Sequence, residues 1–146
     1  GKTDRPLRPQ KIVVTKRPSA NVRDDACPCG SGLAYARCCE PCHCGTAAAT
    51  AEALMRSRYS AYVLNLHDYL RDTWHPDTRP AEFDDAPLHW LGLDVKRHLQ
   101  QDDTHAIVEF VARYRANGRG HRLHETSRFV RENGRWYYVD GDFAAA

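Results

Sequence analysis

Four cysteines near the start of the chain have the types and spacing of a metal site. They form a C-x-C pair, an eight-residue spacer and a C-C pair: Cys27, Cys29, Cys38 and Cys39. Structural zinc takes four sulfur or nitrogen ligands at tetrahedral corners, and two close pairs joined by a turn can supply them. Gly30 and Gly32 give the backbone the freedom to fold one pair onto the other. The stretch therefore predicts a closed four-thiolate zinc site with no position left for a substrate.

Disulfides and free thiols are the alternatives to zinc at these cysteines. Adjacent and alternate cysteines are poorly placed to bridge one another. No apolar export segment stands near the start of the sequence, so we expect a cytoplasmic protein, and the cytoplasm keeps thiols reduced. Both arguments favour zinc.

A second group of possible ligands follows directly, at Cys42, His43 and Cys44. These residues could replace one of the four cysteines or bind a metal separately. Two or three ligands without a fourth make a weak site, so a second metal is the less favoured interpretation. A redox role for the two thiols is the third alternative, although exposed thiols can oxidise without being catalytic.

Size and charge limit the function classes. The chain has 146 residues, 42% of them hydrophobic, which predicts one ordinary domain with a folded core and no membrane-spanning run. Residues 1–26 carry seven Lys or Arg against three Asp, whereas the remainder carries 14 basic and 16 acidic groups. We therefore expect a flexible basic arm over 1–26, and nucleic acid could bind only through that arm.

Helical spacing follows the cysteines. Apolar residues recur every three or four positions over 51–66, and Thr50 is placed to cap the first turn. Asn65 has the type and position of a second cap, which predicts a short helix ending near Asp72. Residues 77–87 are predicted to form a loop with room for one helical turn at 81–85.

The hydrophobic period then changes to two, which is typical of strands. Alternating runs cover 90–99, 106–114, 124–130 and 136–140, and Asn133-Gly134 is a strong hairpin signal. Four antiparallel strands in a curved meander, with helices across one face, make an α+β protein.

Several of these stretches resemble known families. Residues 27–39 resemble the SEC-C motif, a zinc-binding element. Residues 53–62, 73–76, 90–93, 127–129 and 134–141 are similar to the YchJ family. Together the matching stretches span 27–141.

The resemblance implies a cone-shaped, nuclear-transport-factor-2-like α+β fold with a cavity between the long helix and the sheet. It also implies zinc on the four cysteines, and three segments: the arm at 1–26, the zinc motif at 27–45 and the α+β domain at 46–146. Leu33-Ala34 stands where many SEC-C motifs carry lysines, which weakens any implied contact with nucleic acid.

Seven side chains are candidates for the lining of that cavity: Arg58, Trp74, His75, Glu109, Arg113, Glu125 and Arg128. An enzyme would use His75 or Glu109 as a base beside arginines that hold an anionic substrate. The alternative is an ion-pair network, which we favour, since such networks also perturb charges without catalysis. No catalytic residue is assigned.

The sequence supports two hypotheses about function. The first is a cytoplasmic zinc-binding adaptor that recognises another protein, such as a chaperone or a component of the translation or export machinery. The second is a small-ligand binder or enzyme that acts in the cavity, with zinc only holding the N-terminal segment.

Overall fold

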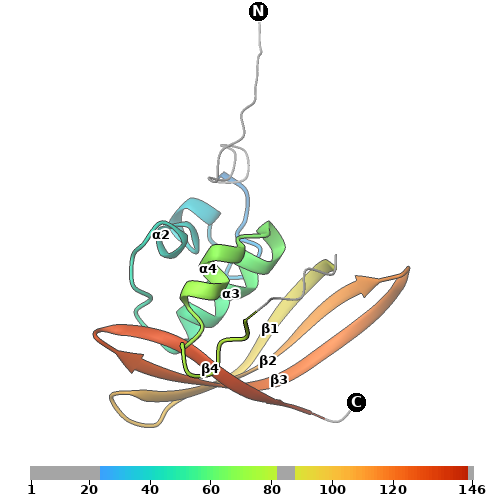
Figure 1. Ribbon diagram of the computed structural model, residues 1–146. Coiled ribbons are helices and arrows are strands. Elements are labelled where there is room, and N and C mark those ends of the chain that lie inside the picture. Colours follow the sequence, from blue (N-terminus) through green and yellow to red (C-terminus); the bar gives the residue numbers. More distant parts are fainter. Residues whose placement is uncertain (1–23, 82–87, 145–146) are drawn as a thin grey trace, which may run out of the picture.

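Helices cover one face of a four-stranded sheet in the computed structural model, which describes residues 24–81 and 88–144 (Figure 1). The predicted arm therefore lies outside the described residues except for 24–26. The helical turn predicted at 81–85 lies outside them except for residue 81.

The sheet is an antiparallel meander in the order β1-β2-β3-β4. Its strands are β1 (His89–Gln100), β2 (His105–Ala116), β3 (Arg119–Glu132) and β4 (Arg135–Phe143). Two-residue turns join β2 to β3 at Asn117-Gly118 and β3 to β4 at Asn133-Gly134, and all four turn residues have positive φ, between 52° and 79°. Asn-Gly suits such turns, because both positions require the left-handed region. The α+β class and the meander are confirmed.

Alternation along the strands decides which residues face the helices. Ala106, Val108, Phe110 and Ala112 on β2 are buried and belong to the core. Register shifts in β1, at Trp90/Gly92 and at Val95/Arg97, interrupt the ladder with β2. Irregularities of this kind bend a strand and increase its twist, which helps the sheet curve around the helices.

The long helix α3 (Ala51–Leu64) lies across the concave face of the sheet. Thr50 Oγ1 accepts a hydrogen bond from Ala53 N at 3.0 Å, which confirms the predicted cap. Asn65 does not begin the next helix: with φ 61° and ψ 42° it ends α3. An Asn tolerates the left-handed conformation that closes many helices, and this preference outweighed its capping preference here.

The shorter helix α4 (His67–Asp72) follows at once. The segment that follows α4 reaches the edge of the sheet. There His75 N donates to Tyr138 O and Tyr138 N donates to Thr73 O, each at 2.8 Å. This backbone bridge runs parallel to β4 and pairs Trp74 with Tyr138. Trp74 is thereby held beside the sheet. Among the helices of the described residues, none has the length and apolar character needed to cross a membrane.

The cysteine segment belongs to the same core as the sheet. It contains two short helical pieces, η1 (Tyr35–Arg37) and α2 (Glu40–His43), next to α3. Buried members of one continuous cluster come from this segment, from α3 and from all four strands: Cys27, Cys29, Tyr35, Cys39, Leu54, Met55, Tyr59, Leu93, Val108, Phe110, Phe129 and Trp136. The segment is thus packed into the domain.

Candidate functional site

The four predicted cysteines converge. The Sγ atoms of Cys27, Cys29, Cys38 and Cys39 all lie within 4.8 Å of one another. Cys29 and Cys38 are 3.6 Å apart and Cys38 and Cys39 are 3.9 Å apart, sulfur to sulfur. Such a group could hold a metal ion.

The loop between the two cysteine pairs uses its glycines as the sequence predicted. Gly30 and Gly32 have φ of 81° and 90°, values that side-chain-bearing residues rarely adopt. Cys27 N donates to Leu33 O at 2.8 Å and closes the loop. The chain therefore reverses within a few residues and returns the second pair of cysteines to the first.

The thiols in this cluster compete for negative charge. Hydrogen bonds from neighbouring thiols, chiefly that of Cys27, lower the pKa of Cys29. The same hydrogen bonding raises the pKa of Cys39, while burial raises the pKa of Cys38 to about 11. Hydrogen bonding within the cluster thus favours negative charge on Cys29 over Cys39. A metal cation would favour the ionised form of all four.

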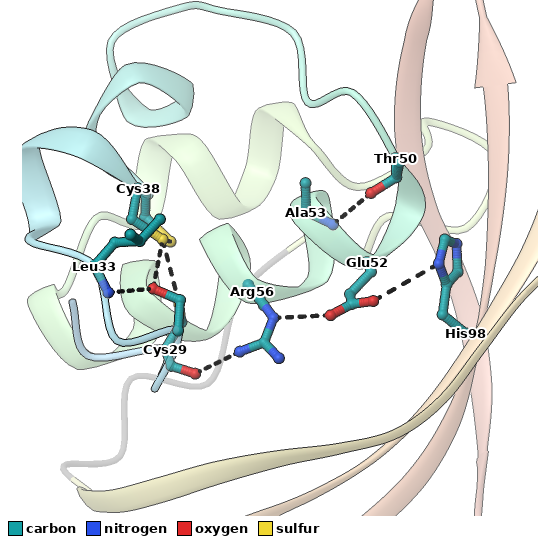
Figure 2. A network of polar contacts seen from close by, with 10 residues as sticks. Cys29, Leu33, Cys38, Thr50, Glu52, Ala53, Arg56 and His98 are labelled. Atoms are coloured by element: carbon teal, nitrogen blue, oxygen red, sulfur yellow. Dashed lines mark hydrogen bonds and ion pairs between the residues drawn. The ribbon is translucent and has the colours of Figure 1, made fainter.

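Helix α3 supports the cysteines through two polar side chains. Ser60 Oγ donates to Cys39 Sγ at 3.4 Å and lies 3.5 Å from Cys27 Sγ. Arg56 Nη1 donates to the backbone oxygen of Cys29 at 2.9 Å. Figure 2 follows this connection onward: Arg56 Nε donates to Glu52, whose other oxygen lies 3.7 Å from His98 Nδ1 on β1. The cluster, the helix and the sheet are therefore linked by one polar network.

Replacing Ser60 with Ala should weaken metal binding by about 10- to 100-fold, the usual cost of removing a hydrogen bond that orients a ligand. The affinity can be measured by competition with a chelating dye. Ser57→Ala is the matched control, because Ser57 is equally buried on α3 but hydrogen-bonds to Leu54 O and Tyr69 instead of to sulfur. An unchanged affinity in Ser60→Ala would show that the hydroxyl does not orient the thiolates.

The three additional predicted ligands lie apart from this cluster. His43 has both ring nitrogens engaged, Nδ1 with Tyr35 Oη at 2.5 Å and Nε2 with Ser57 O at 2.8 Å. Burial lowers its pKa, so the ring is held neutral as a link between α2 and α3. Cys44 is exposed, and Cys42 borders a second cavity of about 320 Å³. In the described part of the chain, the group of close ligand atoms contains only the first four cysteines.

A cavity of about 520 Å³ lies between α3 and the sheet. Its lining is mostly aromatic and aliphatic, with one basic side chain, Arg58, and one acidic side chain, Glu125. The other lining residues are Met55, Tyr59, Tyr62, Trp74, Pro80, Leu88, Trp90, Phe110, Ala112, Leu123, Ser127, Phe129, Tyr138 and Phe143. This volume lies within the range of about 300–1,000 Å³ common for small-molecule sites.

Arg58 is a buried cation in this lining, with 6% of its surface exposed. Nη1 donates to Leu70 O at 2.8 Å and to Thr73 Oγ1 at 2.7 Å. The guanidinium carbon lies 5.3 Å from the ring centre of Trp74 and 4.8 Å from that of Tyr138. Burial lowers the pKa of Arg58. Carbonyl oxygen and aromatic faces thus partly replace water around the charge.

Glu125 is the buried acid of the same cavity. Its Oε2 accepts hydrogen bonds from Ser127 Oγ at 2.8 Å and from Tyr138 Oη at 2.9 Å. Gly141 on β4 makes room for it, because a Cβ atom at Gly141 would overlap this carboxylate. The glycine therefore allows the acid to lie flat against the neighbouring strand.

The structure places three of the seven candidate cavity residues in the lining: Arg58, Trp74 and Glu125. Glu109, Arg113 and Arg128 instead lie on the opposite face of the sheet. There Glu109 contacts His124, Arg113 pairs with Asp94, and Arg128 pairs with Asp140 and Asp142. His75 also lies elsewhere and contacts Glu132 at 2.9 Å. This corrects the expectation that all seven meet at the cavity.

Strand register is the reason for the correction. Glu125 pairs with Phe110 across the ladder, and directly paired residues share a face, so Glu125 points inward with Phe110. Arg128 pairs with Ile107 and so points outward with Glu109. Glu125 therefore points to the face opposite that of Glu109 and Arg113 and does not meet either of them.

Sequence reasoning missed Ser60 and Arg56 beside the cysteines, and Tyr138 and Gly141 beside Glu125. Arg56 and Ser60 are four residues apart, which places them on one helix face, and this spacing was an available signal. For Tyr138 and Gly141 the sequence offered only their place in the last strand.

Comparisons with known proteins agree with this architecture. The family described as the YchJ middle NTF2-like domain matches residues 50–141, and the SEC-C motif matches residues 25–41. A UPF0225 protein of Ralstonia nicotianae is 65% identical over 131 residues, covering 80% of this chain and 90% of that protein. A UPF0225 protein of Bordetella bronchiseptica is 59% identical over 134 residues, covering 88% and 98%.

Two solved structures are also similar. The solution structure of a SEC-C motif containing protein from Rhodopseudomonas palustris has a TM-score of 0.74 and 37% identity, covering 82% of this chain and 98% of that one. The crystal structure of a SEC-C motif containing protein from Psychrobacter arcticus has a TM-score of 0.73 and 30% identity, covering 86% of each. The family and fold expected from the sequence are thus confirmed, and the chain belongs to the YchJ, or UPF0225, family of SEC-C motif proteins.

Proposed function

We propose that this protein binds a small ligand in the cavity and that its four cysteines hold a structural zinc ion. Zinc with four sulfurs at about 2.3 Å requires sulfur–sulfur edges of about 3.8 Å in a tetrahedron. The separations of 3.6 Å and 3.9 Å fit such edges. Four protein ligands leave no position for a substrate, so the zinc stabilises the fold and the ligand binds elsewhere.

The observation that carries the ligand-binding proposal is the buried charge of Arg58 in the cavity wall. Within the described residues the guanidinium has no carboxylate partner. A buried cation without an ion pair is costly to a fold, and functional sites are where such a cost is found.

Ligand binding can be tested by screening a library of small molecules for compounds that raise the melting temperature of the intact chain. Compounds that act through the cavity should lose their effect in Ala112→Leu, because Ala112 is 1% exposed and lines the cavity. If no compound stabilises the chain, or if stabilisation is equal in Ala112→Leu, the cavity is not the binding site.

The adaptor hypothesis remains a second proposal, and an exposed apolar residue in the cysteine segment favours it. Leu33 is 52% exposed, although it lies between cysteines of the core. A partner protein, such as a chaperone or a component of the translation or export machinery, would contact this leucine. Leu33→Asp would then release the partner without affecting ligands of the cavity. Both proposals place the protein in the cytoplasm, where thiols stay reduced for zinc.

A further inference from the structure

We propose that the ligand of the cavity is an organic monocarboxylate with an apolar body, whose carboxylate pairs with Nε and Nη2 of Arg58. This inference rests on the ligand-binding function proposed above and specifies its chemical class.

The first argument is the hydrogen-bonding state of Arg58. Only Nη1 donates to protein groups, to Leu70 O and Thr73 Oγ1. Among the described residues, Nε and Nη2 have no hydrogen-bond acceptor. These two nitrogens form one edge of the planar guanidinium, and that edge matches a carboxylate through two parallel hydrogen bonds. An anion placed there would also compensate the buried charge.

The second argument is the packing of the guanidinium against two aromatic rings that contact each other. Trp74 and Tyr138 hold the group at 5.3 Å and 4.8 Å from their ring centres, and Thr73 fixes it from the end of α4. The side chain is therefore fixed before a ligand arrives, which reduces the ordering cost of binding.

The third argument is the composition of the walls. Around the two charges the cavity is formed by apolar and aromatic side chains, including Met55, Tyr59, Trp90, Phe110 and Phe129. Such walls gain from contact with a hydrocarbon or aromatic body. Three further lining residues, Tyr62, Leu88 and Phe143, are 39%, 39% and 63% exposed and mark the opening to solvent.

Glu125 limits the ligand to a single negative charge. Its carboxylate lies in the same wall as Arg58, and Oε2 accepts hydrogen bonds from Ser127 and Tyr138. A dicarboxylate or a phosphate dianion would bring a second negative charge into a cavity whose lining already includes the carboxylate of Glu125. Like charges in a low-dielectric site repel strongly, so these ligands are disfavoured.

The test uses the full chain in its metal-loaded, reduced form and three probes of similar size: naphthoate, the neutral naphthamide and a naphthalene dicarboxylate. Isothermal titration calorimetry should show naphthoate binding about 10- to 100-fold more tightly than naphthamide, the range expected for charge-assisted hydrogen bonds. The dicarboxylate should bind more weakly than naphthoate.

Variants assign the preference to Arg58. Arg58→Met should bind naphthoate and naphthamide equally, and Arg58→Lys, which keeps the charge but loses the planar edge, should retain part of the preference. Arg128→Met is the control, because Arg128 is an exposed arginine on the other face of the sheet and should leave both affinities unchanged. If Arg58→Met does not fold, the inference is still tested by Arg58→Lys. It is also tested by the ratio of the naphthoate and naphthamide affinities in the unmodified chain.

Two results would overturn the inference, and they differ in what else they overturn. Naphthamide binding as tightly as naphthoate would reject the carboxylate class while leaving ligand binding in place. Failure of all three probes, together with the absence of any stabilising compound in the library screen, would reject the proposed function as well.

Discussion

Removal of the metal from the reduced chain is expected to unfold the domain as one unit. Elemental analysis of the purified protein should first give one equivalent of zinc per chain. Binding to structural zinc sites contributes about 10–16 kcal/mol, whereas a whole domain is stable by about 5–15 kcal/mol. The free energy lost with the zinc would thus be comparable with the entire free energy of unfolding of the domain. Circular dichroism after chelation should show the loss of strand as well as helix signal.

The shared core is the reason for this expectation. Cys27, Cys29 and Cys39 are at most 4% exposed and pack in one cluster with α3 and the sheet. Ser60 and Arg56 tie the same helix to the cysteines. If the four cysteines form a separate unit, chelation will leave the sheet folded with an unchanged melting temperature, and the expectation will be wrong.

Cysteine variants provide the controls. Cys38→Ser should behave like the chelated protein, because it removes one of the four close ligands. Cys44→Ser should keep both the metal and the melting temperature, since Cys44 is exposed and outside the cluster. Both variants change one sulfur to one oxygen, so the difference between their melting temperatures isolates the effect of losing a metal ligand.

Gly141→Ala is expected to be the most damaging single-methyl substitution in the sheet. The added Cβ would overlap the carboxylate of Glu125, which must move and leave the hydroxyls of Ser127 and Tyr138 unpaired. Overpacking costs about 1–3 kcal/mol, and unpaired buried groups add a similar amount. Urea denaturation would measure the fall in the free energy of unfolding.

A second glycine of the sheet, Gly120, provides the matched control for Gly141→Ala. Gly120 lies on β3, and a Cβ added there would have no neighbouring atom within 4 Å, so Gly120→Ala should be neutral or slightly stabilising. A double-mutant cycle isolates the cause: in a Glu125→Ala background, Gly141→Ala should lose most of its cost. A cost that persists in this background would place the effect in the backbone of β4 and not at the carboxylate.

Much of this fold could be predicted from local pattern. The cysteine spacing, the glycines of the loop, the Thr50 cap and the Asn133-Gly134 turn each depend on neighbours in the chain, so the sequence alone identified them. The sequence also contained enough information to assign the residues of β3 to the two faces of the sheet. The two-residue turn at Asn117-Gly118 pairs Ala116 with Arg119 and so sets Glu125 opposite Phe110.

The cavity was less accessible because its chemistry depends on tertiary packing. Arg58 is 12 residues from Leu70 and 15 from Thr73, and its second aromatic neighbour, Tyr138, comes from the last strand. Nothing in the local sequence distinguishes a buried arginine packed against two rings from one in a surface ion pair. The contact of Ser60 with Cys27, across 33 residues, has the same origin.

The backbone bridge between Trp74 and Tyr138 also bears on self-association. A sheet edge with free amide and carbonyl groups can recruit another chain, and the bridge occupies part of that edge on β4. The other edge strand, β1, carries two register shifts and the charged residues Asp94, Lys96 and Arg97. Irregular, charged strands are poor templates for strand addition. The sheet thus resists polymerisation at one edge through its own backbone and at the other through distortion and charge.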